Sequence, residues 1–147
     1  FYLTYNWLKS FPISVTAKMT NLSHDWDTED NFSTVLTFPN GYAQAHLTWT
    51  AGVRKVIYTI QGSLGAITID DDEVQVASSN GTERFSITSH WNDASHVEWF
   101  NSMFDEFLEC IRNQQYVNQE LREAYQCIRL ITRAYESSVK SSLELRL

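Results

Sequence analysis

The stretch EDNFSTVLTFPNGYAQAHLTWTAG, residues 29–52, decides the fold of this chain of 147 residues. Hydrophobic and polar side chains alternate along residues 32–38 and again along residues 42–50. A period of two is typical of a β-strand whose two faces meet different surroundings. Residues 39–41, Pro-Asn-Gly, separate the two runs, and Asn-Gly favours the positive φ of a tight turn. The stretch therefore predicts an antiparallel hairpin.

The second strand of this hairpin has two chemically different faces. One face carries Ala43, Ala45, Leu47 and Trp49, and the other carries Tyr42, Gln44, His46, Thr48 and Thr50. We expect the apolar face to meet helices and the polar face to stay open, as in a sheet covered on one side. His46 on the polar face suits contact with a substrate or a partner subunit, and equally an ordinary surface hydrogen bond.

The alternation continues on both sides of the hairpin. It predicts further strands over residues 14–20, 54–61, 66–70, 73–77, 83–89 and 143–147. The connections are too short for parallel crossovers, so the strands should pair antiparallel. Helical periods predict helices over residues 2–9, 95–112 and 121–135. The predicted fold class is α+β, one domain over residues 1–147 with an open, predominantly antiparallel sheet of about six or more strands and helices packed on one face.

The first long helix has a start signal and an apolar stripe. Ser95 and Glu98 form a capping box, in which each side chain satisfies a free backbone amide. Phe100, Phe104 and Phe107 recur at steps of three and four residues, so they fall on one face of the helix. We expect these three rings to belong to the core.

The charge and cysteine content of the chain restrict its partners and its compartment. The 11 Lys and Arg residues against 18 Asp and Glu residues leave a net charge of -7, which repels nucleic acid and anionic membranes. No window approaches the roughly 18 apolar residues that a membrane-spanning helix needs. Cys110 and Cys127 lie in helical segments, where buried thiols in a reducing, cytoplasmic compartment are favoured over a disulfide.

Two short motifs resemble ligand sites, but their surroundings do not support that chemistry. Residues 62–65, Gly-Ser-Leu-Gly, would hold phosphate only before a helix, and residues 66–69 predict a strand, so the glycines should form a turn. Residues 70–73, Asp-Asp-Asp-Glu, lack the alternating spacing of a calcium loop and predict a solvated turn. The histidine spacings support no metal site. We expect neither a metal nor a dinucleotide to bind to this chain alone.

Candidate ligand-facing residues lie in loops at strand ends. Residues 21–30, NLSHDWDTED, place His24, Asp25 and Trp26 between two strands, where polar groups and a ring suit a ligand, although a solvated loop has the same composition. Arg54 lies at the start of a predicted strand, where it suits clamping a carboxylate or pairing locally. No catalytic Ser-His-Asp or Cys-His set stands out.

Four segments, in this order, resemble the C-terminal domain of the Gfo/Idh/MocA family of NAD(P)-dependent sugar and polyol oxidoreductases. They are residues 2–18, YLTYNWLKSFPISVTAK; residues 29–52, quoted above; residues 57–70, IYTIQGSLGAITID; and residues 124–147, AYQCIRLITRAYESSVKSSLELRL. Their order and spacing together are more specific than any one of them, and they cover nearly the whole chain.

The resemblance implies a function for the chain. In that family an N-terminal Rossmann domain holds NAD or NADP and supplies a Glu-Lys-Pro lysine, and a catalytic His precedes the position of Phe1. No catalytic residue is therefore carried over. The C-terminal domain of the family closes over the substrate and commonly builds the subunit interface through its open sheet face.

We therefore expect the substrate-binding and oligomerisation domain of an oxidoreductase that acts on a sugar, polyol or related hydroxy compound and is inactive alone. The residues expected to face the small-molecule substrate are His24, Asp25, Trp26 and Arg54, and those expected in a homo-oligomer face are Tyr42, Gln44, His46 and Thr48. The alternatives are a non-enzymatic association module that uses the same face, and a ligand sensor that has kept the cleft without the chemistry.

Overall fold

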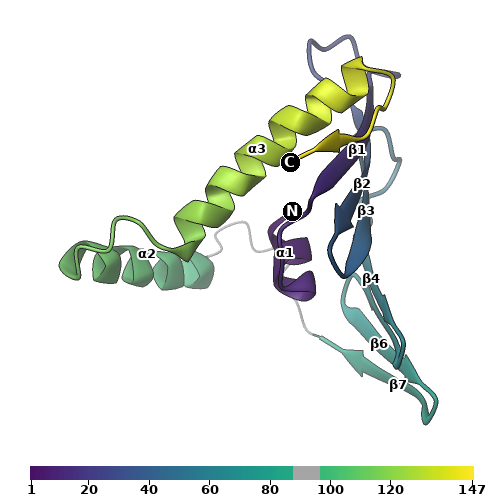
Figure 1. Cartoon of the computed structure of the whole chain (residues 1–147). Helices are drawn as coiled ribbons and strands as arrows, with labels where there is room; N and C mark the ends of the chain where they lie inside the picture. The colour runs from purple at the N-terminus through teal and green to yellow at the C-terminus, as the bar shows by residue number, and fades with distance from the viewer. Residues whose placement is uncertain (88–96) are drawn as a thin grey trace. The chain divides into compact units, whose positions relative to one another are not determined.

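The computed structural model describes the backbone of residues 1–87 and 97–147, and the side chains of residues 1–87 and 100–147. The described chain divides into two compact units, Phe1–Ala51 with Cys110–Leu147, and Gly52–Glu109. Figure 1 shows the helices and strands of both units. The assignment of residues 1–147 to one domain stays a prediction.

The first unit contains a four-stranded sheet, sheet A. Its strands β1 (Ser14–Thr20), β2 (Asn31–Phe38), β3 (Gly41–Thr48) and β8 (Leu145–Arg146) lie in the order β3-β2-β1-β8. Every pairing is antiparallel. Phe38 pairs with Gly41, so the predicted hairpin is confirmed. The expectation of positive φ in its turn is wrong, because neither Asn40 nor Gly41 has a positive φ. Pro39 is the first central residue of the turn, and such a turn is compatible with negative φ at both central residues.

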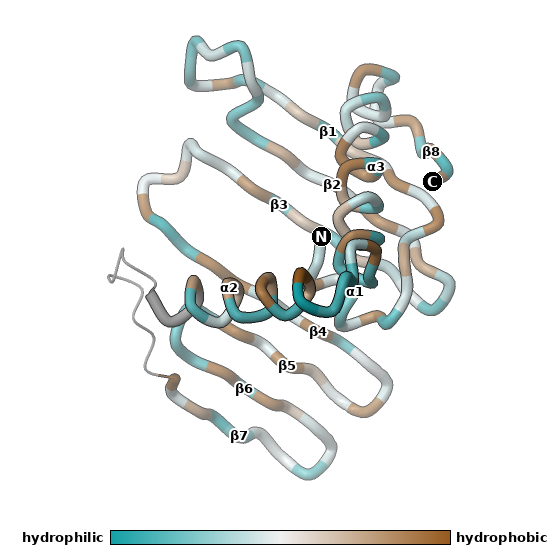
Figure 2. Tube along the Cα trace, turned by 90° about the vertical axis from the view of Figure 1, so that its left-hand side faces the viewer, coloured by the Kyte–Doolittle hydropathy of each residue, from teal (hydrophilic) through white to brown (hydrophobic). Residues whose placement is uncertain are grey.

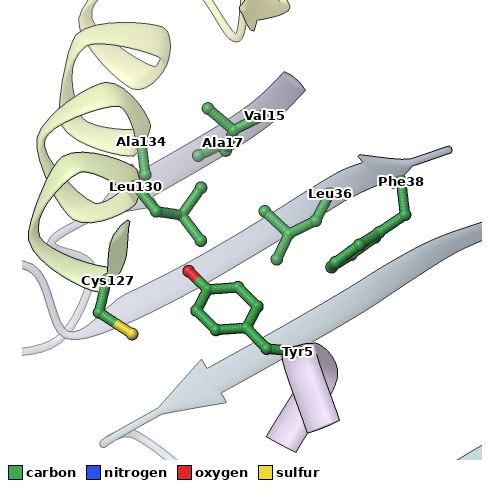
Figure 3. Packing of buried hydrophobic residues seen from close by; sticks show 8 residues of the cluster. All are labelled: Tyr5, Val15, Ala17, Leu36, Phe38, Cys127, Leu130 and Ala134. Carbon is green, nitrogen blue, oxygen red and sulfur yellow. The ribbon is translucent and has the colours of Figure 1, made fainter. Parts of the chain in front are cut away.

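Helices cover one face of sheet A. α1 (Tyr2–Leu8) and α3 (Gln119–Val139) contribute apolar side chains that join those of β1 and β2 in one core (Figure 3). Its members are Tyr5, Val15, Ala17, Leu36, Phe38, Cys127, Leu130 and Ala134. Val15 and Leu130 are fully buried, and burying such a side chain contributes about 1.5–3 kcal/mol. The prediction of helices packed on one face is confirmed for this sheet.

The C-terminal end of α3 is joined to β1 by two serines. The sequence pattern predicts a helix over residues 121–135, and the helix extends to Val139. The hydroxyls of Ser137 and Ser138 accept the backbone N–H groups of Ala17 and Met19, each at 2.9 Å. These amides lie on the edge of β1 beyond its pairing with β8, where they would otherwise have no strand partner.

The second unit contains sheet B. Strands β4 (Ile57–Gly62), β5 (Gly65–Asp70), β6 (Glu73–Ser78) and β7 (Gly81–Ser86) follow one another as an antiparallel meander. The α+β class and the antiparallel pairing are confirmed, and the eight strands of the described residues are divided equally between the two sheets. Hydropathy alternates along these strands (Figure 2), which places Tyr58, Ile60, Ile67, Ile69, Val74, Val76 and Phe85 on one face.

The glycine motif reverses the chain between β4 and β5. Gly62 pairs with Gly65, which leaves Ser63 and Leu64 as the turn. A Cβ atom at Gly65 would lie 2.1 Å from the carbonyl oxygen of Ala77, so only glycine fits at this approach of two backbones. The predicted structural role of this motif is confirmed.

The acidic residues that follow β5 form ion pairs as well as a turn. Lys55 Nζ pairs with the carboxylate of Asp70 and lies 2.9 Å from Oδ2 of Asp71, and Asp71 also accepts the N–H of Val56 at 3.0 Å. The hydrogen bonds to Asp70 and Asp71 raise the pKa of Lys55, and those from Lys55 and Val56 lower the pKa of Asp71. These contacts tie the segment before β4 to the β5–β6 turn.

α2 (Val97–Arg112) carries the predicted apolar stripe, which is visible as brown segments in Figure 2. The side chains of Phe100, Phe104 and Phe107 are 56%, 44% and 57% exposed. The prediction that they are core is wrong, because a helical period shows which residues share a face and not what that face meets. The predicted capping box includes Ser95, which lies outside the described residues, as does the side chain of Glu98.

Candidate functional site

The loop of residues 21–30 is organised around the carboxylate of Asp30. Asp30 is only 1% exposed. Its carboxylate accepts the backbone N–H groups of Leu22 at 3.0 Å, Ser23 at 2.7 Å and His24 at 3.2 Å, and the side-chain amide of Asn31 donates to it at 2.7 Å. A single carboxylate thereby fixes the course of the loop between β1 and β2.

The hydrogen bonds also decide the charge of Asp30. Burial by itself raises the pKa of a carboxyl group. The donors from Ser23, Leu22, Asn31 and His24 outweigh that effect and hold the pKa of Asp30 well below its usual range. Asp30 is therefore a buried anion at neutral pH, and the loop it holds is preorganised.

This loop contains three of the four predicted substrate-facing residues and brings the rings of two of them into contact. The rings of His24 and Trp26 stack with centroids 4.0 Å apart and an interplanar angle of 14°. Nδ1 of His24 lies 3.3 Å from Oδ2 of Asp30, while Trp26 is 50% exposed. Asp25, between the two rings in sequence, is also exposed. The loop presents one aromatic platform beside a solvated carboxylate.

A contact from α3 supports the same loop. The hydroxyl of Tyr135 donates to both carboxylate oxygens of Glu29, at 2.7 and 2.8 Å. This hydrogen bond and partial burial raise the pKa of Tyr135. Neither Tyr135 nor Asp30 was singled out by the sequence pattern, because their partners were not visible there. The position of Asp30 directly before a strand was the one available signal.

Arg54, the fourth predicted substrate residue, belongs to the second unit. Its side chain is exposed, and its positive charge helps to lower the pKa of Asp71, after the larger effects of hydrogen bonds from Lys55 and Val56. Local pairing, one of the two roles considered for Arg54, thus has support. Its role as a clamp for a substrate carboxylate stays a prediction.

The four residues predicted for an oligomer face share one exposed surface. Tyr42, Gln44, His46 and Thr48 alternate along β3 and are all exposed, on the side of sheet A opposite to the helices. Ser33 on β2 lies beside His46, and its Oγ is 2.9 Å from Nδ1 of the imidazole ring. A broad depression on this open face is lined in part by Lys18, Ser33, Gln44 and His46.

A second exposed apolar surface lies on the outer side of α3, away from sheet A. Its main members, at steps of three and four residues, are Leu121, Tyr125, Ile128, Tyr135 and Val139. They lie on the side opposite to Cys127, Leu130 and Ala134, which are in the core. These side chains are exposed, and Tyr135 is hydrogen-bonded to Glu29 of the 21–30 loop.

The described residues do not fit a nicotinamide cofactor, which the sequence resemblance implies. Such a cofactor needs backbone amides at the start of a helix after a parallel strand, whereas residues 62–65 connect two antiparallel strands. In the described part of the chain, no three His, Cys, Asp or Glu side chains gather as metal ligands. No helix there is long and apolar enough to cross a bilayer.

Comparisons with known proteins agree with this fold. A family model described as oxidoreductase family, C-terminal alpha/beta domain, matches residues 2–145. An oxidoreductase from Agrobacterium radiobacter, solved in complex with NAD+, L-tartaric acid and magnesium, is similar with a TM-score of 0.77 and 14% identity over 99% of this chain and 46% of that chain. No curated protein sequence matches.

Two further solved structures show the same fold. The protein yvaA from Bacillus subtilis has a TM-score of 0.69 and 18% identity, over 98% of this chain and 49% of that chain. The WlbA dehydrogenase from Bordetella pertussis, in complex with NADH and UDP-GlcNAcA, has a TM-score of 0.58 and 16% identity, over 97% of this chain and 44% of that chain. The chain thus spans about half the length of each of these proteins.

Proposed function

Because this chain belongs to the C-terminal alpha/beta domain family of the Gfo/Idh/MocA oxidoreductases, we propose that it supplies the substrate side of an NAD(P)-dependent oxidoreductase and joins two copies through the open face of sheet A. The proposed substrate is a sugar, a polyol or a related hydroxy compound. The observation that carries the proposal is the contrast between the two faces of sheet A, one buried under helices and the other polar and exposed.

The cofactor is assigned to a part of the oxidoreductase other than this chain. The chain has no glycine fingerprint for a dinucleotide, and its described strands pair antiparallel in meanders and hairpins. The similar solved proteins that contain NAD+ or NADH are about twice as long as this chain. Hydride transfer would therefore need both halves, and this chain alone would be inactive.

The loop of residues 21–30 is the proposed substrate contact in the first unit. Trp26 offers a half-exposed ring whose other face is stacked on His24, and Asp25 supplies a solvated acceptor for hydroxyl groups. Small-molecule sites combine such rings with a few polar groups that fix orientation. Asp30 holds the loop in place before a substrate arrives, which lowers the entropy cost of binding.

Kinetics of the complete encoded protein test the substrate role. A panel of sugars and polyols with NAD+ and NADP+ is assayed by the absorbance of the reduced nicotinamide. Trp26→Ala should raise KM about tenfold with kcat nearly unchanged, because it removes binding shared by substrate and transition state. Tyr116→Ala, at an exposed ring outside this loop, is the control. An unchanged KM in Trp26→Ala would remove the loop from the substrate site, and a lack of activity with every pair would favour the association module without enzymatic function.

Sedimentation equilibrium of the 147-residue chain tests the association. The wild type should form dimers, and the double variant His46→Asp, Thr48→Asp should stay monomeric because four carboxylates would meet in the interface. Thr132→Asp, which places a charge on the outer side of α3, should dimerise like the wild type. A monomeric wild type, or dimers that are lost only in Thr132→Asp, would contradict the assignment of the interface to the open face of sheet A.

A further inference from the structure

The open-face positions of β1, β2 and β3 carry no carboxylate in a chain that is rich in them; a carboxylate reaches this face at Ser14, whose hydroxyl donates to Glu144 beside β8. The open-face positions of β1, β2 and β3 follow from the strand register. They hold Ser, Thr, Asn, Gln, Val and Tyr, together with Lys18 and His46, and no Asp or Glu. The whole chain has 18 Asp and Glu residues and a net charge of -7. Around Lys18, Ser33 and His46, four residues along β1 from Ser14, an anion therefore meets no carboxylate from these three strands.

Two basic residues of this face lie in one row across three strands, apart from Arg146 of β8, which pairs with Ser14. Lys18 on β1 pairs with Ser33 on β2, and Ser33 pairs with His46 on β3. Side chains that face each other on neighbouring strands have Cβ atoms about 4.5–5.5 Å apart. Ser33 thus lies midway between a lysine and a histidine, and all three line the depression on the open face.

The polar groups of this row retain capacity for a ligand. Lys18 makes no hydrogen bond or ion pair within the described part of the chain, although its ammonium group carries three donors. Nδ1 of His46 lies 2.9 Å from the Ser33 hydroxyl, which leaves Nε2 as the other polar atom of the ring. Gln44, one pair further along β3, adds an amide at the edge of the depression.

Association through this face would bring these basic side chains together. In a two-fold interface, Lys18 and His46 of both copies are removed from water in the same region. Strands β1, β2 and β3 supply no carboxylate beside Lys18, since Glu144 is hydrogen-bonded to Ser14 at the other end of β1, and uncompensated buried charge is strongly unfavourable. A dimer built on this face therefore needs a counterion.

We propose that the open face of sheet A binds a small oxyanion, a phosphate or carboxylate group, between Lys18 and His46 with Ser33 beneath it, and that this anion promotes the association of two copies. The role of the anion in association rests on the self-association proposed above, whereas the binding of the anion does not. Lys18 supplies the charge, and the hydrogen-bonded pair of Ser33 and His46 supplies one directed hydrogen bond, from Nε2–H of the ring or from the Ser33 hydroxyl according to the tautomer.

Binding is tested on the 147-residue chain by NMR, at a concentration where it is monomeric. Inorganic phosphate, and in a second series malonate, replaces chloride at constant ionic strength. The amide resonances of Lys18, Ser33 and His46 should shift and saturate. Lys18→Met should weaken binding about tenfold, as expected for the loss of one charge-assisted contact, while Lys9→Met, outside sheet A, should not. Shifts that do not saturate, or equal binding by Lys18→Met, would overturn the anion site.

Sedimentation in the same buffers tests the link to association. The wild type should associate more tightly in phosphate or malonate than in chloride, and the stronger of the two anions identifies the source of the oxyanion. Lys18→Met should associate equally in all three buffers. Equal association of the wild type in every buffer would overturn the counterion role and leave the proposed dimer intact. A wild type that stays monomeric throughout would refute the dimer, and the NMR titration alone would then decide the anion site.

Discussion

The two faces of sheet A are built from the same strands but have different roles, one in stability and the other in the proposed association. Val15 and Leu36 point to the covered face and are almost fully buried against α1 and α3, while their neighbours in sequence point to the open face. The open face presents Lys18, Ser33 and His46 to solvent. Since a strand alternates its side chains, stability and recognition can be specified independently, one residue apart.

The largest effect is expected on the covered face. Leu130→Ala removes a fully buried side chain from the centre of the core and should lower the free energy of unfolding by about 2–5 kcal/mol, through lost burial and a cavity. Val139→Ala, on the same helix but 85% exposed, should change it by less than about 0.5 kcal/mol. Urea unfolding followed by circular dichroism compares the two. Similar losses in both variants would show that α3 is not packed on sheet A as described.

A smaller effect on the free energy of unfolding is expected where serines of α3 accept the backbone N–H groups at the edge of β1. Ser137→Ala leaves the buried N–H of Ala17 without its acceptor and should cost about 1–3 kcal/mol. The matched change Ser33→Ala removes a hydroxyl from the open face and should cost less than about 0.5 kcal/mol. Equal losses of stability in Ser137→Ala and Ser33→Ala, measured by the same urea experiment, would contradict the proposal that the covered face supports the fold and the open face does not.

The loop at the end of these strands should make stability depend on pH. The pKa of Asp30 is lower in the folded chain than in the unfolded chain, so its contribution is fully present above about pH 4 and is lost as the pH falls toward the folded value. Asp30→Asn should therefore be less stable than the wild type at neutral pH, by a margin that narrows in acid. The exposed Asp25→Asn is the control. A margin that stays constant with pH, measured by thermal unfolding, would show that ionisation of Asp30 does not support the fold.

The smallest effect on stability is expected for the open face itself. His46→Asp with Thr48→Asp should change the free energy of unfolding of the monomer by less than about 0.5 kcal/mol per residue, because both side chains are exposed. Urea unfolding at low protein concentration measures it. A large loss would mean that these residues support the fold, and any failure of the variant to associate would then have a structural cause.

Features that depend on neighbours in sequence were predictable, and features that join distant segments were not. The hairpin of residues 29–52 follows from alternation and a turn, and its pairing was confirmed. His24 and Trp26 lie two residues apart, so their common loop was visible in the sequence. Ser137 acts on an amide 120 residues away, and no local pattern reveals such a contact. Phe104 shows the opposite case, because its periodicity was correct but its side chain is 44% exposed.

Covalent labelling by hydroxyl radicals across a dilution series tests the central claim most directly. The claim is that the open face of sheet A, and not the helix side, joins two copies. As the concentration rises through the association range, Tyr42 and His46 should become protected, while Trp26 and the outer-side Tyr125 keep their reactivity. Protection of Tyr125 on association, with Tyr42 and His46 unchanged, would place the interface on the outer side of α3 and contradict the account.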